Sequence, residues 1–463
     1  MANRQLIAGV DSSTQSVKVV IRDAHTGELV RQGRASHPDG TEVDPSHWLS
    51  GLHAAFADAG GLDDVEAISI AGQQHGMVAI DANGEVIRKA LLWNDTRSAK
   101  EADDLNREVP DIHMRTGSKL VASFTGSKVR WLADHEKANA EKVAAIALPH
   151  DWLSWNLTGA QSLDTLFTDR SDASGTGYFD SNKNEYCNDI FATALRSNRE
   201  VKLPSIVAPH KFGGETKSGA MIAAGAGDNA GAALGLGASV GDLVISLGTS
   251  GTAFAVTSAS THDPSGEVAG FADATGNFLP LACTLNAAKI FNTVSSTLGI
   301  SFDEFSELAL TAPSGSEGLR VIPHFDGERT PNLPQARGRF HGITHSNFTR
   351  ANIARASIEG VIAGMVYAAQ ALEKLGVSYS RVLLIGGAAK NPAVQQIAAD
   401  FFRNEIHLPP TGEYVADGAA KQAAWALNGG SLPPQWNLGE VKTIVPVAAS
   451  SDVVAEYMEL IRN

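Results

Sequence analysis

The stretch Met221–Gly237, MIAAGAGDNAGAALGLG, sets a single carboxylate, Asp228, among glycines and alanines near the middle of the chain. The apolar run at its start predicts a short buried strand, and residues 229–236 predict a helix of small side chains. Asp228 is therefore expected at a strand-to-helix turn, where the lack of side-chain bulk lets a ligand approach the backbone closely.

Two functions are compatible with this turn. Residues 225–230 fit the loose GxGxxA pattern that is typical of dinucleotide-binding proteins. The alternative is that Asp228 acts as a general base. A pyrophosphate bound at the start of the helix would meet the carboxylate of Asp228, and like charges in close contact repel each other. The sequence therefore favours the general base over the dinucleotide site.

The composition indicates a globular enzyme with more than one domain. A chain of 463 residues is too long for one hydrophobic core, and its 43% hydrophobic and 19% charged residues are typical of globular proteins. A formal charge of −14 argues against nucleic acid or an anionic membrane as a partner. The two cysteines lack the spacing of a zinc site, and neither a signal segment nor a membrane-spanning run is recognisable. We therefore expect a cytoplasmic protein.

A strand, a turn rich in hydroxyl side chains and a second strand occur twice along the chain. Residues 5–22 show this order around the turn Ser12–Ser16, and residues 242–256 repeat it around the turn Gly248–Gly251. The repetition predicts two similar domains, residues 1–239 and 240–463. Asp228 would then lie beside the cleft between them, where sites for small molecules are frequent.

The two hydroxyl-rich turns are candidates for binding phosphate. Backbone N–H groups and hydroxyls in such turns hold phosphate oxygens, and Asp11 at the end of the first strand can hold magnesium, directly or through water. Each turn taken alone is better explained as an ordinary hairpin turn. Their duplication favours phosphate binding, although the chain has no GxxxxGK[ST] loop.

Two further motifs, GQQHG at 72–76 and LLWNDTR at 91–97, each follow an apolar run. Their amide, imidazole and carboxylate groups can bind sugar hydroxyls, and the indole of Trp93 suits the apolar face of a sugar. The alternatives are structural: His75 can be a hydrogen-bonded loop residue, and Asn94-Asp95 can cap a helix over 97–105. The sequence leaves both alternatives open.

The segment LLIGGAAKN at 383–391 predicts a strand that runs into a glycine pair, followed by a helix from Pro392. Paired glycines let a nucleoside lie against the backbone, and Asn391 can hydrogen-bond it. Asn391 can also cap the helix that follows. Both functions can hold at once.

These motifs together resemble the FGGY family of carbohydrate kinases, over nearly the whole chain and in the family's order. Any one of them is weak evidence, whereas all of them in register are strong. The motifs that carry the resemblance are the Asp11 loop, GQQHG at 72–76, LLWNDTR at 91–97, SFTGSKVRWL at 123–132, AGAGDNAGAALG at 224–235, SLGTSG at 246–251, DGERTP at 326–331, GRFHGI at 338–343 with ASIE at 356–359, and LIGGAAKN at 384–391.

The resemblance implies an α/β fold of two ribonuclease-H-like (actin-type ATPase) domains, each with a mixed sheet flanked by helices, and a cleft between them. Sugar would bind to the N-terminal domain and ATP largely to the C-terminal one. Many family members have glycine where Ser13 stands, so we expect Ser13 to have a negative φ. The implied site residues are Asp228 as catalytic base; Asp11 for magnesium; Gln74, His75, Trp93, Asp95 and Asn229 for the sugar; and Ser12, Ser13, Thr14, Lys18, Thr249, Gly386, Gly387 and Asn391 for ATP.

The implied reaction is the Mg²⁺- and ATP-dependent phosphorylation of a ketopentose, D-xylulose, at its primary hydroxyl, with in-line transfer of the γ-phosphoryl group. Kinases for another ketose or polyol, such as ribulose, glycerol or gluconate, are the alternatives within the family. A non-enzymatic actin-like ATPase would account for the phosphate turns but not for GQQHG or Asp228. A sugar-binding regulator without catalysis would not need Asp228. The expected partners are sugar and ATP, not nucleic acid or membrane, and a homodimer is the assembly considered.

Overall fold

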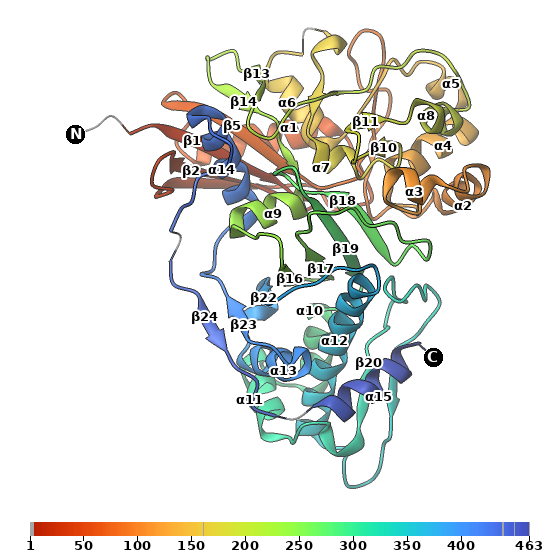
Figure 1. Cartoon of the computed structure of the whole chain (residues 1–463), viewed down its shortest axis with the longest axis vertical. Coiled ribbons are helices and arrows are strands. Elements are labelled where there is room, and N and C mark those ends of the chain that lie inside the picture. The colour runs from red at the N-terminus through yellow and green to blue at the C-terminus, as the bar shows by residue number, and fades with distance from the viewer. Residues whose placement is uncertain (1–3, 161, 438, 449, 463) are drawn as a thin grey trace.

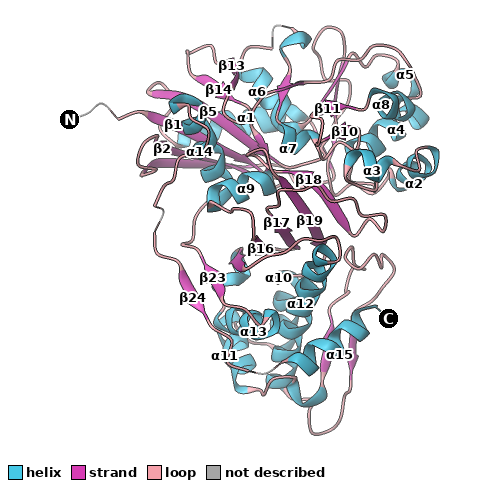
Figure 2. Ribbon diagram, viewed as in Figure 1, coloured by secondary structure: helices cyan, strands magenta, loops and turns pink. Residues whose placement is uncertain are grey.

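The computed structural model describes residues 4–160, 162–437, 439–448 and 450–462. Two seven-stranded mixed sheets, one in each half of the chain, form the framework, and helices cover them (Figures 1 and 2). The expected α/β fold class, with two mixed sheets flanked by helices, is confirmed. Within the described part of the chain, none of the helices combines the length and apolar character needed to cross a membrane.

The strands are grouped into these two sheets and into short pairs. The N-terminal sheet contains β1 (Leu6–Ser12), β2 (Ser16–Asp23), β3 (Leu29–Ser36), β5 (Val65–Gly72), β13 (Phe212–Glu215), β14 (Met221–Ala223) and β15 (Ala226–Gly227). The C-terminal sheet contains β16 (Asp242–Leu247), β17 (Gly251–Ala255), β18 (Val268–Ala272), β19 (Phe278–Thr284), β22 (Arg381–Ile385), β23 (Ile406–Leu408) and β24 (Lys442–Ile444). The short pairs are β4 (Glu42–Val43) with β7 (Ala90–Leu91), β6 (Val78–Ile80) with β8 (Ala145–Ala147), β9 (Phe167–Thr168) with β12 (Ser205–Ile206), β10 (Phe179–Asp180) with β11 (Glu185–Tyr186), and β20 (Arg320–Ile322) with β21 (Arg339–His341).

The helices cover the faces of the sheets and fill the space between them (Figure 2). Their bounds are α1 (Pro45–Asp58), α2 (Ala99–Glu108), α3 (Ile112–Thr116), α4 (Thr125–His135), α5 (Lys137–Ala140), α6 (Pro149–Leu157), α7 (Arg170–Ala173), α8 (Asn188–Leu195), α9 (Asp228–Leu236), α10 (Ala288–Leu298), α11 (Phe302–Thr311), α12 (Arg350–Glu373), α13 (Pro392–Phe402), α14 (Tyr414–Asn428) and α15 (Ser451–Arg462).

The two sheets repeat one arrangement. In each, the first strand of the half, β1 or β16, pairs antiparallel with the strand that follows it and parallel with a later strand, β5 or β22. A third antiparallel strand, β3 or β19, continues each meander. The repetition read from the two hydroxyl-rich turns is therefore present in the topology.

Strand pairing brings three chain segments to one edge of the N-terminal sheet. β5 is paired in parallel with β1 on one side and with β15 on the other, and its last residue, Gly72, lies opposite both Ser12 and Gly227. Because parallel strands end at the same edge, the segments that follow all three strands emerge together. Asp228, the first residue of α9, directly follows β15.

Helix α14 belongs to the C-terminal half but packs against β1, β5 and α9 of the N-terminal half (Figure 1). The contact with α9 is backbone to backbone: a Cβ added to Gly418 would lie 1.8 Å from the carbonyl oxygen of Gly231. A Cβ on Gly9 of β1 would likewise lie 2.0 Å from the carbonyl oxygen of Ala416. The late part of the chain thus helps to position the helix that begins at Asp228, and the boundary at 239/240 stays a prediction.

We expect Gly418→Ala to destabilise the protein by about 1–3 kcal/mol or more, because the two helices must move apart to admit the methyl group. The matched control is Gly364→Ala in the middle of α12, where the added Cβ would meet no other atom within 4 Å. That change should stabilise by about 1 kcal/mol, since alanine is the better helix former. Thermal unfolding followed by circular dichroism measures both, and equal shifts in Tm for the two variants would contradict the backbone contact.

Candidate active site

Two carboxylates, Asp11 and Asp228, lie together at the sheet edge described above. Burial raises the pKa of Asp228 to about 7, and the negative charge of Asp11 is a second, smaller cause of this rise. Asn229 limits this rise, because its backbone N and its Nδ2 donate hydrogen bonds to Asp228 Oδ1 at 2.7 and 2.8 Å. A carboxyl group that titrates near neutral pH is a stronger base than an ordinary aspartate.

Asp11 is the penultimate residue of β1 and is buried. Burial raises the pKa of its carboxyl to about 6, against a hydrogen bond donated by Ser13 Oγ and the charge of Lys18. Lys18 Nζ lies 4.0 Å from Asp11 Oδ2 and also pairs with Glu413. The hydroxyl of the neighbouring Ser12 is buried without a hydrogen-bond partner in the described chain. The predicted negative φ of Ser13 is confirmed, because Ser13 is absent from the described residues with positive φ.

His75 follows β5 in a left-handed conformation, with a φ of 71°. Its Nδ1 lies 2.8 Å from the carbonyl oxygen of Gly175, and its ring stacks on Phe124. Burial, above all, lowers the pKa of His75 to about 3, so the ring is neutral. A carbonyl oxygen only accepts, so Nδ1 carries the proton and Nε2 is left as a hydrogen-bond acceptor.

The other predicted sugar contacts are connected to the same edge. Gln74 is buried, and its Nε2 donates to the carbonyl oxygen of Ser171 at 3.3 Å. Trp93 Nε1 donates to Thr14 Oγ1 at 2.9 Å. This bond joins the LLWNDTR segment to the turn that follows Asp11, so the candidate sugar and phosphate residues share one network.

Asp95 has a different environment from the one expected. Its Oδ2 accepts from Thr41 Oγ1 at 2.8 Å, and its Oδ1 accepts from both N and Nε of Arg97 at 3.0 and 2.8 Å. Burial alone would raise the pKa of Asp95, but these bonds outweigh it and lower the pKa. The helix-cap alternative for Asn94-Asp95 was wrong: α2 begins at Ala99 with Ser98 as its cap residue, because Asp95 closes a local turn onto Arg97 instead.

The candidate nucleotide residues meet at the edge of the C-terminal sheet. β16 and β22 are parallel neighbours, so the turn at 248–251, with Thr249 exposed, lies beside the glycine pair after β22. Gly386 has a φ of 96°, and a Cβ there would lie 2.5 Å from the carbonyl oxygen of Leu247. A Cβ on Gly387 would meet nothing within 4 Å. The first glycine is therefore required by packing, and the second faces open space.

Asn391 caps α13, which confirms the structural alternative. Its Oδ1 accepts from the backbone N of Ala393 and Val394 at 2.9 and 3.2 Å and from Ser306 Oγ at 2.8 Å. Its Nδ2 is buried and has no hydrogen-bond partner among the described residues. An unused buried donor beside an open glycine fits a nucleoside, so the cap and the ligand contact are compatible.

Several charged residues of this region were not found by sequence reasoning. Lys128 is fully buried, its Nζ donates to the carbonyl oxygen of His75 at 3.1 Å, and burial lowers its pKa to about 7. Arg329, from the C-terminal half, is close enough to contribute to the low pKa of His75. A buried group of His150, Asp151, Asp169 and Asp172 lies behind the site. In the sequence, Arg329 is part of a charged turn. Nothing in the sequence indicates that His150 contacts the three aspartates.

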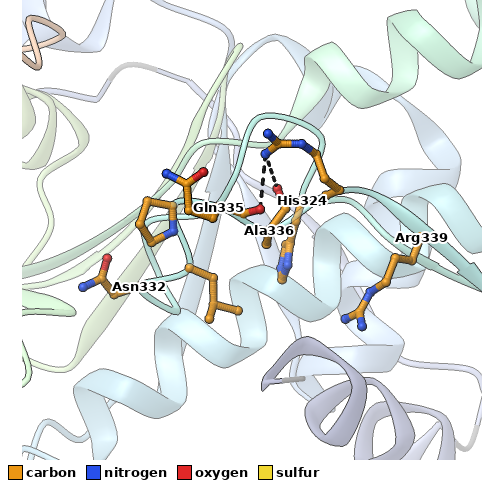
Figure 3. A pocket seen from close by; sticks show the side chains of 8 residues that line it. His324, Asn332, Gln335, Ala336 and Arg339 are labelled. Atoms are coloured by element: carbon orange, nitrogen blue, oxygen red, sulfur yellow. Dashed lines mark hydrogen bonds between the residues drawn. The ribbon is translucent and has the colours of Figure 1, made fainter.

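A cavity of about 360 Å³ lies elsewhere, in the C-terminal half (Figure 3). It is lined by residues 332–337 together with His324 and Arg339. Arg337, one of the lining residues, donates to the carbonyl oxygens of Gln335 and Ala336. None of the predicted site residues lines this cavity, so we assign the chemistry to the sheet edge rather than to it.

Comparison with known proteins gives the family. The models of the N-terminal and C-terminal domains of the FGGY family of carbohydrate kinases match residues 6–237 and 243–427. A xylulose kinase from Streptomyces coelicolor is 40% identical over 456 residues, covering 94% of this chain and 92% of the relative. The crystal structure of a xylulose kinase from Bifidobacterium adolescentis is 44% identical, with a TM-score of 0.91 and coverage of 99% of this chain and 100% of that one.

A gluconate kinase from Lactobacillus acidophilus shares the fold, with a TM-score of 0.88 over 99% of this chain and 97% of that one, at 23% identity. The family matches together cover most of the chain, and the fold agrees over its whole length. The protein belongs to the FGGY family of carbohydrate kinases, which are enzymes that use ATP to phosphorylate sugars.

Proposed function

We propose that this protein phosphorylates D-xylulose to D-xylulose 5-phosphate, with ATP as donor and Asp228 as general base. The observation that carries the proposal is the meeting of Asp228, Asp11 and neutral His75 at one sheet edge. The identity of the sugar is supported by relatives named xylulose kinases at 40% and 44% identity.

Asp228 would take the proton of the primary hydroxyl as that oxygen attacks the γ-phosphorus. Both hydrogen bonds from Asn229 go to Oδ1, which leaves Oδ2 to accept the proton. In a loose phosphoryl-transfer transition state, positioning contributes more than basicity. The strand pairing that holds Asp228 at the sheet edge is therefore as important as its raised pKa.

Asp11 is the residue proposed to hold magnesium, directly or through water. A buried carboxylate with an unpartnered hydroxyl beside it, that of Ser12, suits a hydrated cation that prefers oxygen ligands. When bound, the ion would offset the negative charge that develops on the phosphoryl oxygens.

Two of the proposed contacts, those of His75 and Asn391, use polar atoms that the internal hydrogen bonds leave available. His75 offers Nε2 as an acceptor to a sugar hydroxyl, with Gln74, Trp93, Asp95 and Asn229 as the other proposed sugar contacts. For ATP, the phosphates would meet residues 12–14, Lys18 and Thr249. The adenosine would lie at Gly386 and Gly387 and take a hydrogen bond from Asn391 Nδ2.

Replacing Asp228 by asparagine removes the proton acceptor while preserving the shape of the side chain. We expect kcat to fall by about 10²–10⁴-fold and sugar binding to remain. ADP release and isothermal titration with sugar measure the two effects. Asp39→Asn, at an exposed aspartate, is the control and should leave both unchanged. Turnover near the wild-type rate in Asp228→Asn would refute the assignment.

The rate should depend on pH through Asp228. Only the ionised carboxylate accepts a proton, so kcat/KM for the sugar should fall about tenfold per pH unit below a pKa of about 7. Asn229→Ala removes one hydrogen bond to the carboxylate and should move this acidic limb to higher pH. Initial rates between pH 5 and 9 measure both profiles. If the acidic limb of the kcat/KM profile stays at the same pH in Asn229→Ala, the group that titrates is not Asp228.

The sugar can be tested by ADP release with Mg·ATP and a panel of xylulose, ribulose, glycerol, gluconate and fuculose. We expect kcat/KM for xylulose to exceed that of every other member by about tenfold or more. Gluconate is the most informative competitor, because a gluconate kinase shares the fold over the whole chain. A preference for another sugar would overturn the proposed substrate and leave the family unchanged.

A further inference from the structure

Three buried carboxylates surround one histidine behind the active site. His150 Nε2 lies 3.3 Å from Asp151 Oδ1, 3.4 Å from Asp169 Oδ1 and 3.2 Å from Asp172 Oδ2. None of the four side chains is more than 2% exposed. They come from α6 and from the segment that enters and forms α7, and they take no part in the reaction proposed above. We refer to these four residues as the His150 cluster.

Charge is the main constraint on this cluster. Burying a carboxylate without a cation or hydrogen-bond donors is costly. Both oxygens of Asp172, and Asp151 Oδ1, lack a hydrogen-bond donor in the described part of the chain. His150 is the member that can carry a positive charge. Burial opposes that charge, but the three carboxylates outweigh burial and raise the pKa of His150 to about 9.

The cluster is connected to the active site through α7. Asp169 caps this helix: its Oδ1 accepts from the backbone N of Asp172 at 3.0 Å and its Oδ2 from that of Ser171 at 2.6 Å. Ser171 in turn binds both sides of the site. Its Oγ accepts from the backbone N of Gly227, immediately before Asp228, and its carbonyl oxygen accepts from Gln74 Nε2.

His150 also contacts the backbone segments that carry the active-site residues. A Cβ on Gly225 would lie 2.6 Å from His150 Nδ1, and a Cβ on Gly72 would lie 3.1 Å from His150 Cβ. These glycines belong to the segment that leads to Asp228 and to the end of β5. His150 therefore packs against both of the backbone segments that place the candidate base and the sugar contacts, with its ring beside Gly225 and its Cβ and backbone beside Gly72.

We propose that His150 is a positioning residue, whose buried imidazolium holds Asp151, Asp169 and Asp172 together and thereby fixes α7 and residues 225–227 beneath Asp228. The kinetic part of this inference rests on the proposed role of Asp228. The effect on folding does not.

A divalent cation is the competing occupant. Ligand atoms of His150, Asp151 and Asp172 lie within 4.8 Å of one another. A metal would bind the lone pair of Nε2 in place of its proton, so the two occupants exclude each other. That triad does not include Asp169, so a metal bound there would leave the third carboxylate, 3.4 Å from Nε2, outside its ligand set. The imidazolium lies within 3.4 Å of an oxygen of each of the three carboxylates and is the occupant we favour.

The inference predicts how stability depends on pH. His150 keeps its proton up to about pH 9 in the folded state, against about 6.5 unfolded, so its stabilisation is lost as pH rises through that window. Burial raises the pKa of Asp151 to about 6 and that of Asp172 well above its usual value. Both groups hold their protons more tightly in the folded state, so their contribution to stability also falls as pH rises. The other titratable groups facing the cluster are Tyr178 and Tyr186, whose raised pKa keeps them neutral, and Asp228, which interacts with Asp172.

The experiment compares wild type, His150→Gln, His150→Lys and the exposed control His47→Gln. We expect His150→Gln to lower kcat by about 10- to 100-fold, with a smaller effect on the KM for ATP, because the proposed adenosine residues lie in the other half. His150→Lys restores the charge and should bring kcat back to within about fivefold of wild type. Thermal unfolding is measured from pH 6 to 9.5. The Tm of the wild type should fall as pH rises, whereas the Tm of His150→Lys should stay constant.

Three outcomes would overturn the inference. These are wild-type kinetics in His150→Gln, a wild-type Tm that does not fall between pH 7 and 9, and a His150→Lys variant as impaired as His150→Gln. Stoichiometric metal in purified wild-type protein, with a loss of Tm on chelation, would assign the cluster to a cation instead. If His150→Gln does not fold, the comparison of pH profiles between wild type and His150→Lys still decides. If the sugar assignment fails, the stability results are unaffected.

Discussion

The parallel pairing of β5 with β1 on one side and β15 on the other is the constraint on which the candidate site depends. A parallel sheet can bring the carboxyl ends of strands that are far apart in sequence to one edge. Here the sheet brings together Asp11, the Gln74-His75 pair and Asp228. Asp11 and Asp228 are more than 200 residues apart in the sequence. The glycines at 72 and 227 keep this edge narrow enough for the groups to interact.

The carboxylates at and behind that edge are accommodated in different ways. Asp228 and Asp11 keep raised pKa values, which suits one for accepting a proton and the other for binding a cation. Asp95 is held ionised by Arg97. In the His150 cluster a protonated imidazole takes the place of a metal or an arginine. The electrostatic arrangement around the base thus extends well behind the residues that would touch substrate.

Local chemistry was predicted well where neighbouring residues determine it. The turn at Asp228 and the cap formed by Asn391 before Pro392 were both expected, because glycine, asparagine and proline have strong local preferences. The cap alternative for Asn94-Asp95 was wrong, since Asp95 accepts hydrogen bonds from Arg97 and from Thr41, a residue distant in sequence.

By itself, the sequence determined the two-part α/β plan, the strand-to-helix turn that carries Asp228 and the family to which the motifs belong. These features depend on hydrophobic periodicity, on the conformational preferences of glycine and proline, and on the order of the motifs, all of which can be read directly along the chain. Only the tertiary structure decided that α14 crosses to the N-terminal sheet, that His75 is neutral, that Asp95 is bonded to Thr41 as well as to Arg97, and that His150 meets three aspartates. Burial and contact between distant segments set these properties, and neither is encoded by the residues adjacent in the chain.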